Sequence, residues 1–268
     1  MTAGWVEVGE GVSVWRHPVL DVNATLITGE GESLLIDTLS TPRQARRLGV
    51  TPSQVVNTHH HFDHCFGNQV YAGCRIWAHR ETERVLVERP GEVMAEALRE
   101  FGEEHPERGD LTEVQIVPPT DIVGDQATLD VGGRRVELRH VGPGHTAGDL
   151  IVIVPDARVA IAGDLVEEGA PVQFSDAYPL DWPHALAELL HLMAQTGGAW
   201  RIVPGHGAVV DEAFVRRQHD ELAALAWLIR EGHAAGFPPQ EVAARSPLGP
   251  GPSLEAVRRG YAQLDGRL

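Results

Sequence analysis

The motif THHHFDH, residues 58–64, says most about how this chain folds and what it binds. It follows a short apolar run that we expect to be a strand, so the motif should lie on a loop at the strand's carboxyl end. His59 and His61 can approach one ion from one side of an extended loop, whereas Asp63 and His64 follow a turn and point elsewhere. Three imidazoles and a carboxylate this close together favour a bound cation. Zn²⁺ suits these donors, with Fe or Mn as alternatives.

Three later segments share one form, in which an apolar run leads to a glycine-flanked residue that can bind a metal. They are GPGHTAGD (142–149) with His145, AIAGD (160–164) with Asp164, and VPGHG (203–207) with His206. A rigid sheet presents functional groups at one edge in this way. A lone histidine in a glycine turn is more often a hydrogen-bonded turn residue, so the prediction of a metal site depends on all four segments together.

In this order, THHHFDH, GHTAGD, AGD and PGHG resemble the motifs of the metallo-β-lactamase-fold hydrolase superfamily, over roughly residues 10–210. The resemblance implies an α/β (α+β) fold, a four-layer αββα sandwich with the site at one edge of its two sheets. It also implies a binuclear site with two metal ions, expected to be Zn²⁺. The implied ligands are His59, His61 and His145 for one ion, Asp63, His64 and His206 for the other, and Asp164 as the bridge between them.

The resemblance further implies hydrolysis without a protein nucleophile. Two metal ions share a water whose pKa falls to around neutrality or below, and the resulting hydroxide attacks a carbonyl while one ion stabilises the oxyanion. Asp63 is the expected catalytic side chain, because its carboxylate can accept a hydrogen bond from that hydroxide and orient it.

Asp164 favours a glyoxalase II-like hydrolase of esters, thioesters or lactones. In the β-lactamases of the superfamily this position is typically cysteine or serine, and a lysine often receives the substrate carboxylate. This chain contains no lysine, so β-lactam hydrolysis is the weaker alternative. A second alternative is a persulfide dioxygenase-like oxidoreductase, in which the equivalents of His59, His145 and Asp164 hold one iron. Metal analysis would distinguish the hydrolase from the dioxygenase. Two zinc ions per chain would support hydrolysis, and one iron with oxygen uptake would support the dioxygenase.

Composition argues against several other classes of protein. The 38 acidic residues outnumber the 22 arginines, and the resulting net charge of −16 repels the phosphate backbone of a nucleic acid. No apolar run reaches the roughly 18 residues of a membrane span, and the first ten residues show no secretory signal. Cys65 and Cys74 cannot form a disulfide framework. We therefore expect a cytoplasmic enzyme with a small-molecule substrate and neither a nucleic-acid nor a membrane partner.

The sequence predicts a catalytic domain over residues 1–210 and a C-terminal helical extension over 211–268 that packs on it. The extension contains two apolar patterns with helical spacing. Asp211 is the expected N-cap of the first of these helices, and Ser253 that of the last.

Other segments are candidates for supporting roles. Residues 80–105 read as helices broken at a proline and glycine, and they form either a flap over the substrate or an outer helix pair. A strand is expected at 114–117. Residues 176–183, DAYPLDWP, are either a wall of the substrate pocket or a capping and core segment. Asp37 is a candidate to orient a ligand histidine, whereas His60 is expected to pack or face solvent.

Overall fold

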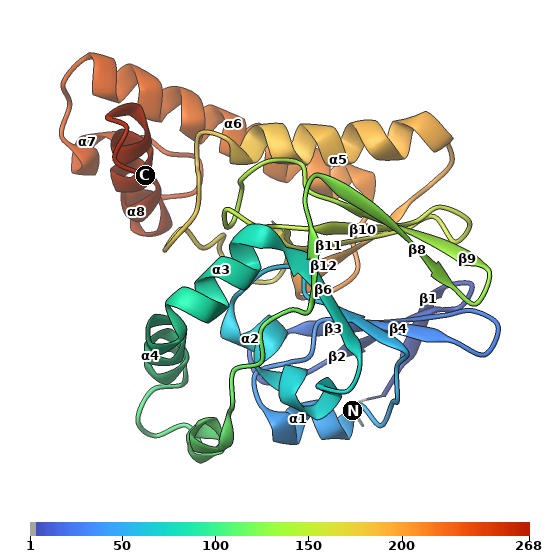
Figure 1. Ribbon diagram of the computed structural model, residues 1–268. Coiled ribbons are helices and arrows are strands. Elements are labelled where there is room, and N and C mark those ends of the chain that lie inside the picture. Colours follow the sequence, from blue (N-terminus) through green and yellow to red (C-terminus); the bar gives the residue numbers. More distant parts are fainter. Residues whose placement is uncertain (1–3) are drawn as a thin grey trace.

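The computed structural model describes residues 4–268 as two β-sheets stacked face to face, with helices on both outer sides (Figure 1). The first sheet has the strand order β1-β2-β3-β4-β5-β6-β7. Its strands are β1 (Val6–Gly9), β2 (Val12–Arg16), β3 (Asn23–Thr28), β4 (Ser33–Ile36), β5 (Gln54–Val56), β6 (Arg75–His79) and β7 (Asp121–Val123). Strands β1 to β4 pair antiparallel, and β4 to β7 pair parallel.

The second sheet has the strand order β12-β11-β10-β9-β8. Its strands are β8 (Gln126–Val131), β9 (Arg134–Arg139), β10 (Ile151–Val154), β11 (Val159–Glu167) and β12 (Arg201–His206). Only the β11–β12 pair is parallel within this sheet. Every residue of β10 and β11 is buried, which explains why their sequences are apolar on both faces.

Helices cover the outer face of each sheet, and α5 and α6 run along the second one (Figure 1). The helices are α1 (Pro42–Arg47), α2 (Phe62–Cys65), α3 (Arg80–Glu88), α4 (Pro90–Phe101), α5 (Trp182–Thr196), α6 (Glu212–Ala234), α7 (Pro239–Ala243) and α8 (Pro250–Leu264), with 3-10 turns η1 (Phe66–Tyr71) and η2 (Arg108–Glu113). Among the described residues, no helix combines the length and apolar character needed to cross a bilayer.

Apolar side chains between the layers confirm the expected αββα sandwich. Ile36 and Val56 of the first sheet pack against Leu138 and Val152 of the second, which forms the core between the sheets. On the outer side of the first sheet, buried apolar residues pack against α1. This arrangement buries both faces of each sheet, so catalytic groups can only reach solvent at the sheet edges and on the loops.

The helices after residue 210 share a core with the second sheet. Leu225 of α6 and Val257 of α8 belong to the same buried cluster as Ile151 of β10. This common core supports our proposal that residues 211–268 are an extension packed on the domain formed by 1–210, whose first three residues lie outside the described part of the chain.

The N-cap prediction for this extension is confirmed at one helix and wrong at another. Asp211 accepts a hydrogen bond from the backbone N–H of Phe214, as a capping carboxylate does. Helix α8, however, begins at Pro250, and the hydroxyl of Ser253 in its first turn donates to Ser246 Oγ at 2.7 Å. Proline is well suited to the first helical position, because its fixed φ matches the helix and it has no N–H to leave unpaired.

The segment before β7 also differs in part from expectation. Residues 80–105 form α3 and α4 with a break immediately before Pro90, as predicted. Residues 114–117 do not form the expected strand, and the two prolines that follow, 118 and 119, have no N–H with which to continue one. Ile116 of this run packs instead with the apolar cluster around α4.

Candidate metal centre

The residues singled out in the four motifs come from four parts of the fold and meet at one edge of the sandwich. The first group lies between the end of β5 and the end of α2, and the others lie on the β9–β10 loop, in β11 and at the end of β12. Together they make up two adjoining sets of side chains, which are His59, His61, His145 and Asp164 in one set and Asp63, His64 and His206 in the other.

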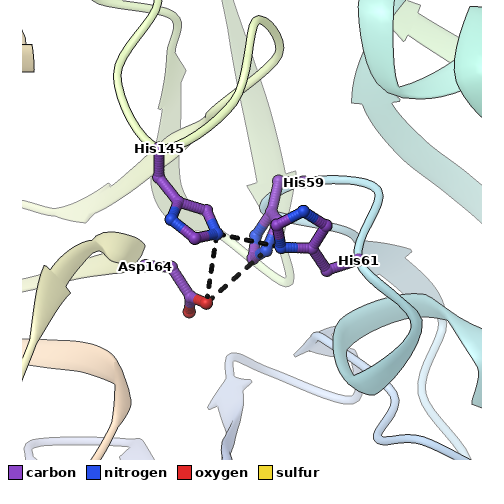
Figure 2. A group of neighbouring side chains, drawn as sticks. All are labelled: His59, His61, His145 and Asp164. Atoms are coloured by element: carbon purple, nitrogen blue, oxygen red, sulfur yellow. Dashed lines mark hydrogen bonds and ion pairs between the residues drawn. The ribbon is translucent and has the colours of Figure 1, made fainter. Parts of the chain in front are cut away.

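In the first set, one nitrogen or oxygen atom of each residue lies within 4.8 Å of those of all the others (Figure 2). His145 Nε2 is 2.9 Å from His61 Nδ1 and 3.4 Å from Asp164 Oδ2. His59 Nε2 is 3.7 Å from the same Asp164 oxygen. Ligand atoms at the corners of a zinc tetrahedron are roughly 3.3 Å apart, given bonds of 2.0–2.1 Å. The set therefore has the spacing of a metal site.

The second set has similar spacing and also includes contacts to Asp164. His206 Nε2 is 3.3 Å from Asp63 Oδ2 and 3.4 Å from His64 Nε2. Asp164 Oδ2 lies 3.3 Å from His206 Nε2, and its Oδ1 lies 3.1 Å from His64 Nε2. The Asp164 carboxylate thus faces both sets at once.

Unpaired polar atoms show that this donor set fits a cation. His59 Nε2 and Asp164 Oδ1 are buried without an aligned hydrogen bond. The facing ring nitrogens of His61 and His145 can share only one proton between them. Leaving a buried polar atom unpaired costs about 1–3 kcal/mol. A metal ion accepts lone pairs from all of these atoms, so the imidazole and carboxylate donors suit Zn²⁺, Fe or Mn.

The carboxylates draw positive charge onto three of the rings. Burial by itself would lower the pKa of His61, but Asp176 raises it to about 10. Burial by itself would lower the pKa of His64 and His206, but the nearby Asp164 carboxylate holds both pKa values well above the usual one. Burial would raise the pKa of Asp164, but His64, His206 and His59 together hold it well below its ordinary value. Burial lowers the pKa of His145 to about 4 and that of His59 well below its usual range. The site therefore combines neutral lone-pair donors with carboxylates that attract cations.

Asp37 lies against His64, consistent with the predicted orienting role. Its Oδ2 accepts a hydrogen bond from His64 Nδ1 at 2.8 Å, which leaves His64 Nε2 facing the site. Its two oxygens also accept hydrogen bonds from the backbone N–H and the hydroxyl of Thr58, both at 2.8 Å. Asp37 has a φ of +59°, a conformation uncommon for residues other than glycine, which the surrounding hydrogen bonds hold in place.

Sequence reasoning missed two acidic residues near the histidines. Asp176 Oδ1 is 3.1 Å from His61 Nε2, and its Oδ2 is 3.1 Å from the Nε2 of His60. The expectation that His60 packs or faces solvent is therefore incomplete, since its buried ring faces a carboxylate. Glu167 Oε1 is 3.6 Å from His145 Nδ1. The strand pattern that placed Asp164 also continues to Glu167, and this was the available signal for the second acid.

A cavity of about 430 Å³ opens onto the site. Its wall includes residues of both sets, and also Glu96, Arg99 and Glu100 of α4. Part of the segment 80–105 thus faces the space where a substrate would bind. In the other candidate segment, 176–183, Asp176 lies next to the site through its contact with His61.

Comparison with known proteins agrees with the resemblance seen in the motifs. The model of the metallo-beta-lactamase superfamily matches residues 17–206. A metallo-beta-lactamase type 2 from Bacillus cereus is 27% identical over 173 residues, which cover 63% of this chain and 57% of that protein. A hydroxyacylglutathione hydrolase from Maricaulis maris is 24% identical over 190 residues, which cover 68% of this chain and 62% of that protein. Neither match reaches two thirds of the relative's length.

Among solved structures, a stereoselective inverting sec-alkylsulfatase from Pseudomonas sp. has the same fold. It superposes with a TM-score of 0.74 at 20% identity, and the match covers 97% of this chain and 50% of that one. The family model spans well over half of the sequence and includes every residue of the two sets. This chain therefore belongs to the metallo-beta-lactamase superfamily.

Proposed function

We propose that this protein is a metal-dependent hydrolase that cleaves an ester, thioester or lactone with two divalent cations. The expected metal is Zn²⁺. The observation that carries the proposal is the position of Asp164, whose carboxylate faces both sets of side chains within 3.1–3.4 Å. A single buried carboxylate shared by two adjoining donor sets suits a pair of cations better than one.

In this proposal His59, His61 and His145 hold one ion, and Asp63, His64 and His206 hold the other, with Asp164 between them. Bound divalent cations would lower the pKa of a water and polarise the oxygen of the scissile group. Asp63 is also on the cavity wall, so its carboxylate can accept a hydrogen bond from the attacking water and orient it. Asp37 keeps His64 turned toward the site through its bond to Nδ1.

The cavity supports a small-molecule substrate. Its volume of about 430 Å³ falls within the range typical of small-ligand pockets. The net charge of −16 supports the absence of a nucleic-acid partner, and the two free thiols, Cys65 and Cys74, support a cytoplasmic location.

The acyl substrate class is supported by Asp164 in place of cysteine or serine, and by the match to a hydroxyacylglutathione hydrolase. β-Lactam hydrolysis is the second candidate, because a metallo-beta-lactamase is among the curated relatives. The chain has no lysine to bind the carboxylate of a β-lactam, which makes this substrate the less favoured one.

A substrate panel on protein of known metal content tests the proposal. We expect chromogenic esters, thioesters or lactones to be hydrolysed faster than β-lactams or alkyl sulfates. A chelator should abolish this activity because the ions supply the activated water, and added Zn²⁺ or Mn²⁺ should restore it. One iron per chain with oxygen uptake, or activity that survives complete metal removal, would contradict the proposal.

A further inference from the structure

One arginine of helix α8 is hydrogen-bonded to the loop that precedes α5. The Arg259 guanidinium donates hydrogen bonds to three consecutive backbone carbonyls, those of Ser175 at 3.1 Å, Asp176 at 2.7 Å, and Ala177. The side chain is half-buried, and a planar group with donors in a fixed fork holds such a run of acceptors in one geometry. The backbone on both sides of Asp176 is therefore tied to the C-terminal helix.

A second side chain of α8, one helical turn further on, holds the same loop. Gln263 accepts a hydrogen bond from the backbone N–H of Leu180 at 3.1 Å and donates one to Asp181 Oδ2 at 2.7 Å. Asp181 occupies the N-cap position of α5 but makes no side-chain capping bond there. The loop is thus bound to α8 at two points on one face of that helix, four residues apart.

The loop held in this way presents Asp176 to two neighbouring histidines. Its oxygens lie 3.1 Å from His61 Nε2 and 3.1 Å from His60 Nε2. The other nitrogen of the His61 ring, Nδ1, is the one that faces His145 in the metal centre. A carboxylate that accepts a hydrogen bond from the Nε2–H group of His61 leaves the lone pair on Nδ1, pointing toward the ion.

We propose that Arg259 and Asp176 act as one positioning unit for His61, with Arg259 fixing the loop and Asp176 fixing the ring and its proton. The C-terminal extension, which lies outside the residues matched by the family model, thereby contributes to metal affinity without touching the ion. This inference rests on the proposed metal site.

An alternative is that His60, His61 and Asp176 hold a further cation, since their ligand atoms also have the spacing of a metal site. That arrangement would require His61 to bind ions through both ring nitrogens and so to lose its second proton. A neutral imidazole has only one free lone pair, so the hydrogen-bonded arrangement is the one that we favour. The two arrangements predict different metal contents.

The test measures the affinity of metal-free protein for Zn²⁺ by competition with a chromogenic chelator. Arg259→Ala and Asp176→Ala should each weaken binding of the ion that His61 would hold by about 10- to 100-fold, the usual effect of removing a residue that orients a ligand histidine. The double variant should bind no more weakly than Asp176→Ala, because the two residues act through one contact. Asp176→Asn, which keeps an acceptor oxygen, should recover part of the affinity.

Arg258→Ala is the matched control, since Arg258 is the exposed neighbour on α8 and lies 3.7 Å from Glu255. It should bind Zn²⁺ like the unaltered chain. The visible spectrum of the Co²⁺-loaded protein gives a second readout, and we expect Arg259→Ala and Asp176→Ala to change it in the same way. Arg259→Lys should show an intermediate affinity even if Arg259→Ala folds poorly, because an ammonium group cannot reach all three carbonyls.

Each outcome decides between the readings. Normal affinity in Arg259→Ala, or fully additive losses in the double variant, overturns the positioning unit. Loss of one whole equivalent of metal in Asp176→Ala, with the remaining ions bound normally, assigns a further cation to His60, His61 and Asp176 instead. If the unaltered chain binds no metal, the proposed function itself fails. If the unaltered chain binds metal and the variants bind it with the same affinity, only this inference is refuted.

Discussion

Asp164→Asn should lower turnover by on the order of 1000-fold and weaken the binding of both metal ions. The reason is that the Asp164 carboxylate lies within 3.1–3.4 Å of His64, His145 and His206, and asparagine keeps the shape of the side chain but loses the charge. Steady-state kinetics on the best substrate of the panel, together with metal analysis after gel filtration, would measure both effects.

Asp156→Asn is the control for this change. Asp156 is an exposed aspartate that forms an ion pair with Arg134 at 3.1 Å, and it belongs to neither set of site residues. This variant should keep normal activity and metal content. Near-normal turnover in Asp164→Asn would rule out the shared carboxylate as the centre of the site.

The second large effect is expected from Gly205→Ala, at the residue before His206. A Cβ atom at this position would lie 1.6 Å from Asp164 Oδ1 and 3.0 Å from the Asp164 backbone nitrogen. Because β11 and β12 are neighbouring buried strands, the backbone has little freedom to move apart. We expect the Asp164 carboxylate to be pushed out of the site, with loss of metal and a free energy of unfolding lower by about 1–3 kcal/mol.

Urea unfolding of the metal-free protein separates the packing effect of Gly205→Ala from the loss of metal. Gly73→Ala serves as the control, because a Cβ there meets no atom within 4 Å. This control should change neither property. Retention of both ions at normal affinity in Gly205→Ala would show that the contact with Asp164 does not limit the site.

The candidate site could be predicted from sequence because its residues follow strands. The chain places His59 three residues after the end of β5 and His206 at the end of β12, and strand ends that meet at one edge bring distant motifs together. The THHHFDH motif adds a local cluster whose members are close in space simply because they are close in sequence. His145 is the exception, because it lies on the β9–β10 loop and was found from its own motif.

Contacts that depend on a loop path could not be predicted in the same way. Asp176 lies 115 residues after His61, in a segment with no periodicity, and its backbone carbonyl accepts a hydrogen bond from Arg259 of α8. Ser253 fails as a predicted cap for a different reason. The sequence offers two residues that favour a helix start, a proline and a serine three residues apart. The helix begins at Pro250, because the φ angle of proline already suits a helix.

Anomalous diffraction from crystals of the zinc-loaded protein is the most direct test of two cations sharing Asp164. We predict two peaks at the zinc absorption edge, one among His59, His61 and His145 and the other among Asp63, His64 and His206, with the Asp164 carboxylate contacting both. A single peak, or peaks away from these side chains at full zinc loading, would contradict the account.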